Sequence, residues 1–271
     1  MIVFLGTSVS RLREQQHMEA HLRELEALDF RFSFSAIPDN FSDDARSSSC
    51  YKGLEGERVN LSTLGEISAP CFGEVIWLNL FNVRGAQSGS GWLSDFVSLE
   101  SLWIEGGAIN DRCLASVRDL QHLRELRVVG VDLDDPGLLQ FGDLSKIKVL
   151  SFSNNRVSSA GLQSSNLQSA KEIYLANTLV GPDLTFLSSA SSELSILDLR
   201  NTGVTDASMQ QIASFPQLEV LVLSGTAVSD AGVRELLRMH ALKDLRLRGT
   251  GVSNDCIQQL ATALPKLRIG I

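Results

Sequence analysis

The sequence repeats itself at intervals of 24 residues over most of its length. In the clearest unit, Leu218, Leu221 and Leu223 precede Thr226, Val228 and then the run Ser-Asp-Ala-Gly-Val. Equivalent residues recur one interval earlier and one interval later. A regular period of this length is typical of a chain built from stacked units, each of which buries its apolar side against its neighbours. Successive units begin at positions 75, 99, 123, 147, 170, 194, 218, 242 and 267.

Each unit combines a strand pattern with a helix pattern. Its fourth and sixth residues are apolar and alternate with polar neighbours, which predicts a short strand with one buried face. A polar pair such as Ser229-Asp230 then supplies a helix N-cap, and apolar residues follow at helical spacing, as at Val233, Leu236 and Met239. We therefore expect an α/β solenoid shaped as a horseshoe, with a parallel sheet on its concave side and short helices on its convex side.

The position three residues after each strand carries a side-chain oxygen in the later units. Such an oxygen can satisfy backbone groups where the chain turns sharply out of the strand. The residues concerned are Asn155, Thr178, Thr202, Thr226 and Thr250.

Two units depart from the helix pattern. Their convex segments, residues 158–169 and 181–193, are rich in serine, and the second begins with Gly181-Pro182. We expect loops or short 3₁₀ turns in these two segments rather than full helices.

These motifs resemble the leucine-rich-repeat family, in a bacterial subtype that reads L-x-x-L-x-L-x-x-T-x-V-[ST]-D-A-G-L. The stretch from Leu218 to Val233 matches it almost throughout, and the resemblance covers about residues 75–271. It implies binding of a protein or other ligand on the concave face, without catalysis in the repeats. The chain also resembles the repeats of F-box substrate receptors, which leaves a substrate-recognition subunit of a ubiquitin-ligase-like complex as an alternative.

The N-terminal region, residues 1–74, reads as a cap on the solenoid of residues 75–271, which holds about eight repeats and a terminal fragment. Residues 10–28 form an amphipathic helix pattern, and the alternating aromatic residues from Phe30 to Phe34 predict a strand. We expect that strand to pair beside the strand around Leu78, because the first unit needs a partner for its open edge. A long loop over residues 35–59 and a short helix over residues 60–67 follow.

A metal site is the one catalytic alternative that the sequence suggests. His17 and His21 are four residues apart on the predicted helix and could chelate a metal, which would favour a metal-dependent hydrolase. The zinc-protease motif requires H-E-x-x-H, whereas the glutamate here is displaced to Glu19. A solvated helix face is the simpler explanation of the pair, and we expect no cofactor, no metal and no enzymatic activity.

Charge and hydropathy restrict the partners. The net charge of −8 argues against general affinity for nucleic acid, which requires clustered basic residues. The apolar start, residues 1–5, is too short to span a bilayer, so we expect no membrane insertion by the chain as given. A cytoplasmic location is the default, and a membrane-anchored or exported protein is the alternative if an apolar segment precedes this sequence.

The predicted concave face supplies the candidate binding residues. Outward positions of the strands are aromatic in the first units and charged in the last ones, and Trp, Tyr and Arg dominate protein interfaces. We therefore expect a non-enzymatic protein-binding or scaffold module with a protein partner, although the aromatic residues could instead pack against the cap or against residues 35–59. The candidate residues are Trp77, Phe81, Trp103, Arg127, Tyr174, Asp198, Arg200, Arg246 and Arg248.

Overall fold

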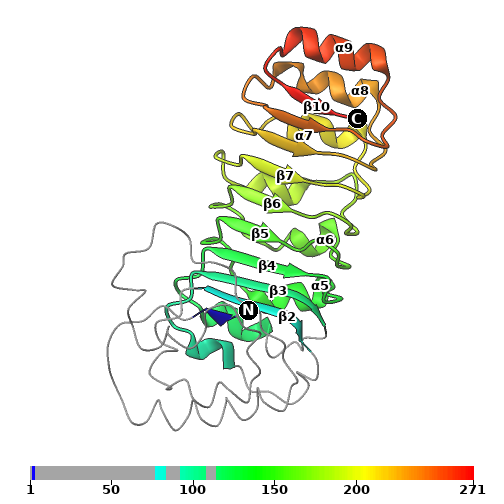
Figure 1. The fold of residues 1–271 in the computed structure, drawn as a ribbon. Helices are drawn as coiled ribbons and strands as arrows, with labels where there is room; N and C mark the ends of the chain where they lie inside the picture. Colours follow the sequence, from blue (N-terminus) through cyan, green and yellow to red (C-terminus); the bar gives the residue numbers. More distant parts are fainter. Residues whose placement is uncertain (1, 4–76, 84–91, 108–113) are drawn as a thin grey trace, which may run out of the picture. The chain divides into compact units, whose positions relative to one another are not determined.

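The computed structural model describes residues 2–3, 77–83, 92–107 and 114–271. It divides into two compact units, of which the first runs to Val131 and includes Gln140–Gly142, and the second comprises Asp132–Leu139 and Asp143–Ile271. In each unit the strands form one layer and the short helices lie on one side of it (Figure 1). The expected boundary at residue 74, the helix over 10–28 and the loop over 35–59 lie outside the described residues and remain predictions.

The first unit contains a sheet in which β1 pairs antiparallel with β2, and β2, β3 and β4 are parallel. Ile2 is the register partner of Leu78 on the edge of β2 away from β3. The expectation that the strand from Phe30 to Phe34 pairs beside Leu78 was therefore wrong, because the N-terminal residues take that edge. The elements are β1 (Ile2–Val3), β2 (Trp77–Val83), η2 (Trp92–Asp95), β3 (Ser101–Gly107), η3 (Ser116–Asp119) and β4 (Glu125–Val129).

The second unit contains a parallel sheet whose strands follow one another in sequence order. Its strands are β5 (Val149–Ser151), β6 (Glu172–Tyr174), β7 (Ile196–Asp198), β8 (Val220–Val222), β9 (Asp244–Arg246) and β10 (Arg268–Gly270). Its helices are α5 (Asp135–Leu138), α6 (Ser159–Leu162), η5 (Thr185–Ser189), η6 (Asp206–Ser208), α7 (Met209–Ile212), α8 (Asp230–Val233), η7 (Arg234–Arg238) and α9 (Asn254–Ala263), and η4 (Leu139–Phe141) follows α5.

The core of the second unit lies between the strand layer and the helix layer. Leu221 on β8 pairs in register with Leu197 on β7 and with Leu245 on β9, and all three side chains are 0% exposed. Each such leucine contributes about 1.5–3 kcal/mol through burial of its apolar surface. On the helix side, Met209 and Ile212 are also fully buried. The strand frame and the helix stripe predicted from the sequence are thus confirmed.

The two irregular segments differ from each other. Residues 181–193 contain the 3₁₀ helix η5, as expected. Residues 158–169, however, begin with the α-helical turn α6, whose N-cap Ser158 accepts hydrogen bonds from Ala160 N and Gly161 N. The expectation of a loop or 3₁₀ turn was wrong for the single turn of α6, because this N-cap satisfies the first free amides just as in the regular units, whereas residues 163–169 form turns and loop as expected.

The predicted oxygen at the turn after each strand bonds back to its own strand. Thr202 Oγ1 donates to Leu199 O at 2.6 Å, and the other three threonines make the same bond. Asn155 does more, since its Nδ2 donates to Phe152 O at 3.0 Å while its Oδ1 accepts from Leu133 N of the preceding repeat. These bonds satisfy backbone groups that the turn removes from the sheet.

A clamp between neighbouring repeats explains the Ser-Asp-Ala-Gly run. The carboxylate of Asp206 accepts from Ser229 N at 2.8 Å and from Ser229 Oγ at 2.6 Å, one repeat later. The same pair of bonds joins Asp135 to Ser158 and Asp230 to Ser253.

The clamp leaves no space for a side chain at the glycine of this run. A Cβ at Gly161 would lie 2.2 Å from Asp135 Oδ1, and one at Gly232 would lie 2.4 Å from Asp206 Oδ1. At these two clamps the carboxylate of one repeat therefore leaves room only for glycine in the next repeat, whereas the clamp between Asp230 and Ser253 has Cys256 at the equivalent position.

The clamp also changes the acidity of its carboxyl groups. Burial favours the neutral form of Asp206, but hydrogen bonds from the hydroxyl and amide of Ser229 and from the amide of Gly232 outweigh it, so the pKa of Asp206 is lowered. Hydrogen bonds from the amide and hydroxyl of Ser253 lower the pKa of Asp230. Both clamps are therefore fully formed only when these carboxyl groups are ionised.

Candidate binding surface

The face of the second-unit sheet turned away from the helices carries the candidate residues of the later repeats. We define this outer sheet face by the first and third residues of β5–β10 and by the second residue after each strand. Tyr174, Asp198, Val222 and Arg246 are register neighbours on β6 to β9. Adjacent strands lie about 4.8 Å apart, so these four residues form a row across the sheet of roughly 15 Å.

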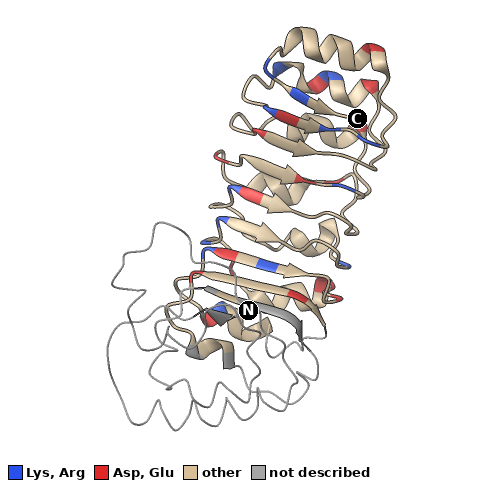
Figure 2. Ribbon diagram, in the orientation of Figure 1, with Lys and Arg blue, Asp and Glu red and all other residues tan. Residues whose placement is uncertain are grey.

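Arginines on this face are oriented by less exposed aspartates. Asp198 is only 6% exposed, and its carboxylate accepts from Arg200 N at 3.0 Å and from Arg200 Nη2 at 2.9 Å. Asp244 accepts from Arg246 Nε at 3.2 Å and faces Arg268 Nη2 at 3.3 Å. Figure 2 shows acidic and basic positions close together on the strands near the C-terminus.

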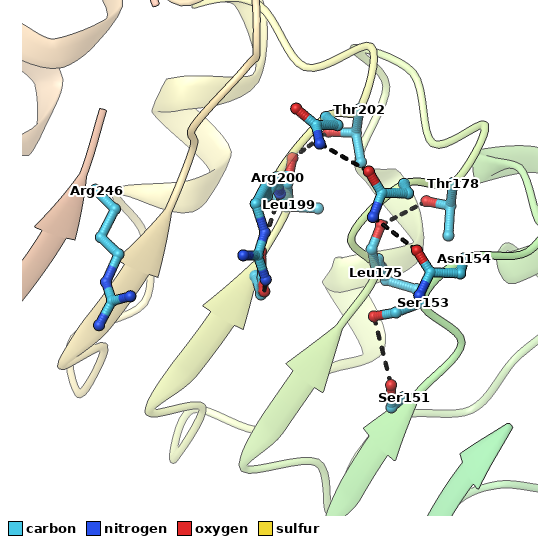
Figure 3. A network of polar contacts seen from close by, with 12 residues as sticks. Ser151, Ser153, Asn154, Leu175, Thr178, Leu199, Arg200, Thr202 and Arg246 are labelled. Atoms are coloured by element: carbon cyan, nitrogen blue, oxygen red, sulfur yellow. Dashed lines mark hydrogen bonds and ion pairs between the residues drawn. The ribbon is translucent and has the colours of Figure 1, made fainter. Parts of the chain in front are cut away.

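The arginine side chains themselves remain open to solvent. Those of Arg200, Arg246 and Arg268 are 50%, 59% and 81% exposed. Arg248 is also exposed, and within residues 114–271 it forms no ion pair. Figure 3 shows the guanidinium groups of Arg200 and Arg246 on neighbouring parts of this face. The ion pairs they make are worth little for stability at such exposure.

A ladder of asparagines borders the outer sheet face where the strands end. Asn177 Nδ2 donates to Asn154 Oδ1, and Asn201 Nδ2 donates to Asn177 Oδ1, both at 2.7 Å (Figure 3). All three residues are exposed and have positive φ values of 53–59°, a conformation in which asparagine is favoured among non-glycine residues. Gly225 and Gly249 take over this position in the next two repeats.

Tyr174 and the neighbouring apolar side chains complete the face. Tyr174 is half-buried, and its hydroxyl donates to Glu172 Oε2 at 2.8 Å. Ile196 and Val220 are register partners and are partly exposed. An apolar strip therefore lies beside the arginines.

The first unit presents an aromatic residue together with a cation. Trp103 is half-buried on β3, and Arg127, its register partner on β4, places Cζ 5.9 Å from the centre of the Trp103 ring. Arg127 is also paired with Glu125. The strand backbone of β2 includes Trp77 and Phe81, but their side chains lie outside the described residues, so the grouping of the three aromatic residues remains a prediction.

Comparison with solved structures identifies the fold. Internalin C2 of Listeria monocytogenes superposes with a TM-score of 0.56 at 17% sequence identity, over 77% of this chain and 88% of that protein. The chain has the leucine-rich-repeat fold. The motif of the bacterial subtype remains a resemblance, since no family model and no curated protein matches the sequence.

Two other leucine-rich-repeat structures are similar over smaller parts of their length. A leucine-rich-repeat protein of Leptospira interrogans matches at 14% identity with a TM-score of 0.47, over 71% of this chain and 52% of that protein. The plant peptide hormone receptor RGFR1, solved in complex with RGF2, matches at 17% identity with a TM-score of 0.42, over 70% of this chain and 29% of the receptor. The chain thus spans about half of the first protein and under a third of the second.

The leucine-rich-repeat sheet brings together five of the nine candidate residues. Tyr174, Asp198, Arg200, Arg246 and Arg248 lie on the outer sheet face of the second unit, as the repeat frame predicted. Asp198 differs from the others because its carboxylate is buried and engaged with Arg200, which makes it an orienting residue.

The sequence interpretation missed Asp244, Arg268 and the asparagine ladder. Arg268 could have been found, because it occupies the same place in the terminal fragment as Asp244 does in the preceding repeat. The ladder could also have been found, since asparagine stands immediately before the turn residues Asn155, Thr178 and Thr202, and glycine stands there before Thr226 and Thr250.

Neither alternative function gains support from these observations. His17 and His21 lie outside the described residues, and within the described part of the chain no three His, Cys, Asp or Glu side chains are grouped so that they could hold a metal. In the same residues, no helix has the length and apolarity needed to cross a bilayer. The comparisons give no support to a ubiquitin-ligase subunit or to a hydrolase.

Proposed function

We propose that the chain is a non-enzymatic protein-binding module that uses the outer sheet face of its leucine-rich repeats. The observation that carries this proposal is a set of solvent-exposed arginines on one face. Asp198 accepts a hydrogen bond from Arg200 and Asp244 accepts one from Arg246, and Tyr174 lies on the same face. Arginine and tyrosine, together with tryptophan, are the residues that most often supply binding energy at protein interfaces.

The orientation of these arginines reduces the entropic cost of binding. A long side chain that is already held by a hydrogen bond loses less rotamer freedom when a partner arrives. The side chain of Arg200 is held by the bond from Nη2 to Asp198, whose carboxylate also accepts from Arg200 N, and the side chain of Arg246 is held by one contact to Asp244. Since exposed ion pairs contribute little to folding, such pairs are better explained by recognition than by stability.

Photo-crosslinking tests this proposal directly. A photoreactive amino acid replaces Ser224, which is partly exposed beside the arginines, and in a control variant it replaces Gln210, which is exposed on α7. After irradiation in a lysate of the source organism, the Ser224 variant should give a discrete protein adduct that the Gln210 variant does not give. Equal adducts from both variants, or an adduct from the Gln210 variant alone, would contradict the proposal.

A further inference from the structure

The charge of the outer sheet face reverses that of the whole chain over β7–β10. The chain carries a net charge of −8, whereas this part of the face holds four arginines and two aspartates, an excess of two positive charges. The residues are Asp198, Arg200, Asp244, Arg246, Arg248 and Arg268. A local field of this sign attracts anionic groups.

The guanidinium groups keep donors for a ligand. Arg246 uses Nε toward Asp244, and Arg200 and Arg268 each use Nη2 toward their aspartate. A guanidinium has five N–H donors, so each group retains several, and its planar fork fits a carboxylate. Arg248 has no ion pair within residues 114–271, so no carboxylate of that part of the chain occupies its fork.

The residues around the arginines are apolar, and their side chains are short or absent. Val222 and Gly270 are the register neighbours of Arg246 on either side, and a Cβ at Gly270 would lie 3.6 Å from Arg246 Cγ. Ile196 and Val220 form the adjacent apolar strip. A partner that fits this surface therefore carries apolar side chains as well as negative charge.

The spacing of the cations indicates an extended ligand. Arg200 and Arg248 occupy equivalent positions on repeats that are two strands apart, which corresponds to about 10 Å. Three residues of an extended chain cover about the same distance. Because side chains of an extended chain alternate between two faces, carboxylates two or four residues apart on a segment crossing the strands would point toward the two arginines.

We propose that the outer sheet face of β7–β10 binds an acidic protein segment that carries Asp or Glu among apolar residues. This inference rests on the proposed function and names the chemistry of its partner. A nucleic acid fits less well, because Asp198 beside Arg200 and Asp244 beside Arg246 and Arg268 interrupt the positive charge along which a continuous phosphate backbone would lie.

Selection from a display library of random peptides on the immobilised full chain tests this inference. Recovered peptides are then titrated by fluorescence anisotropy against the wild type and the double variant Arg246→Glu/Arg248→Glu. The control is Arg234→Glu/Arg238→Glu, which makes the same charge change at two exposed arginines of η7 on the helix side. Urea unfolding of both variants verifies that they fold. If Arg246→Glu/Arg248→Glu does not fold, Arg246→Gln/Arg248→Gln is used in its place.

The expected result is a peptide pool enriched in Asp and Glu. Its members should lose about tenfold or more in affinity on the face variant and be nearly unaffected by the control. If the recovered peptides are neutral or basic but still lose affinity for the face variant, the inference of an acidic ligand is wrong, while the proposed function still holds.

Peptides that bind all variants equally would overturn both the inference and the proposed function for this face. Tighter binding of a single-stranded oligonucleotide, lost on the same face variant, would overturn the choice of a protein segment.

Discussion

Replacement of Gly161 by alanine tests the clamp between neighbouring repeats. At an unobstructed helical position, alanine is more stable than glycine by about 0.5–1 kcal/mol. At Gly161 the new methyl group would lie 2.2 Å from Asp135 Oδ1 and 2.4 Å from Asp135 Cγ, far inside van der Waals contact. The aspartate would have to move, and we therefore expect the sign of the usual effect to reverse.

The size of the effect follows from what Asp135 would lose. Its carboxylate accepts from Ser158 N at 2.8 Å and from Ser158 Oγ at 2.6 Å. An overpacked methyl group costs about 1–3 kcal/mol, and a hydrogen bond to a charged group contributes about 1.5–3 kcal/mol. The two terms add to about 2.5–6 kcal/mol. Partial exposure of Asp135 and Ser158 and the usual gain of about 0.5–1 kcal/mol for alanine over glycine both reduce this sum, so we expect a net loss of about 1–3 kcal/mol.

Urea unfolding followed by far-ultraviolet circular dichroism measures this loss. Gly181→Ala is the matched control, because a Cβ at Gly181 meets no atom within 4 Å. The control should be neutral or slightly more stable, by at most about 1 kcal/mol. If Gly161→Ala is as stable as the wild type, the carboxylate does not exclude a side chain there and the explanation of the repeat glycine is wrong.

Three further predictions concern the fold. Leu221→Ala should lower the free energy of unfolding by about 2–5 kcal/mol, measured by the same urea titration, and a loss below about 0.5 kcal/mol would show that the repeat frame is misplaced. Thr202→Val should cost about 1 kcal/mol because Leu199 O loses its buried hydroxyl donor, and an unchanged unfolding midpoint would contradict this. The lowered pKa of Asp206 means that its clamp stabilises the fold above the unfolded value near 3.8 and is lost as the pH falls through the lower folded value. Thermal melting between about pH 5 and pH 2 should therefore show a drop that is smaller in Asp206→Asn, and identical pH profiles would refute the clamp's role.

The sequence predicted the fold because the repeat fixes which residues face the core. Spacing alone placed Leu197, Leu221 and Leu245 at equivalent positions, and a buried leucine ladder is the only arrangement that satisfies all of them. The outer sheet face followed from the same frame, since residues between two buried strand positions point the other way.

The contacts between repeats could not be predicted from one unit. Ser229 was interpreted as a helix N-cap, which is confirmed by its bond from Ala231 N, but its bonds to Asp206 depend on the distance between neighbouring repeats. The edge partner of β2 was also misassigned, because the alternating aromatic pattern after Phe30 gave a stronger strand signal than the short segment Ile2–Val3. The clarity of a strand pattern in the sequence does not determine which segment pairs with the edge strand of a sheet.

The affinity of the partner captured through position 224 for charge-reversed variants tests the central claim most directly. Surface plasmon resonance compares the wild type with Arg246→Glu/Arg248→Glu and with the helix-side control Arg234→Glu/Arg238→Glu. If the outer sheet face is the binding surface, the face variant should bind about tenfold or more weakly, while the control should match the wild type. Equal affinity of the face variant and the wild type, or a loss confined to the control, would show that the protein binds its partner elsewhere.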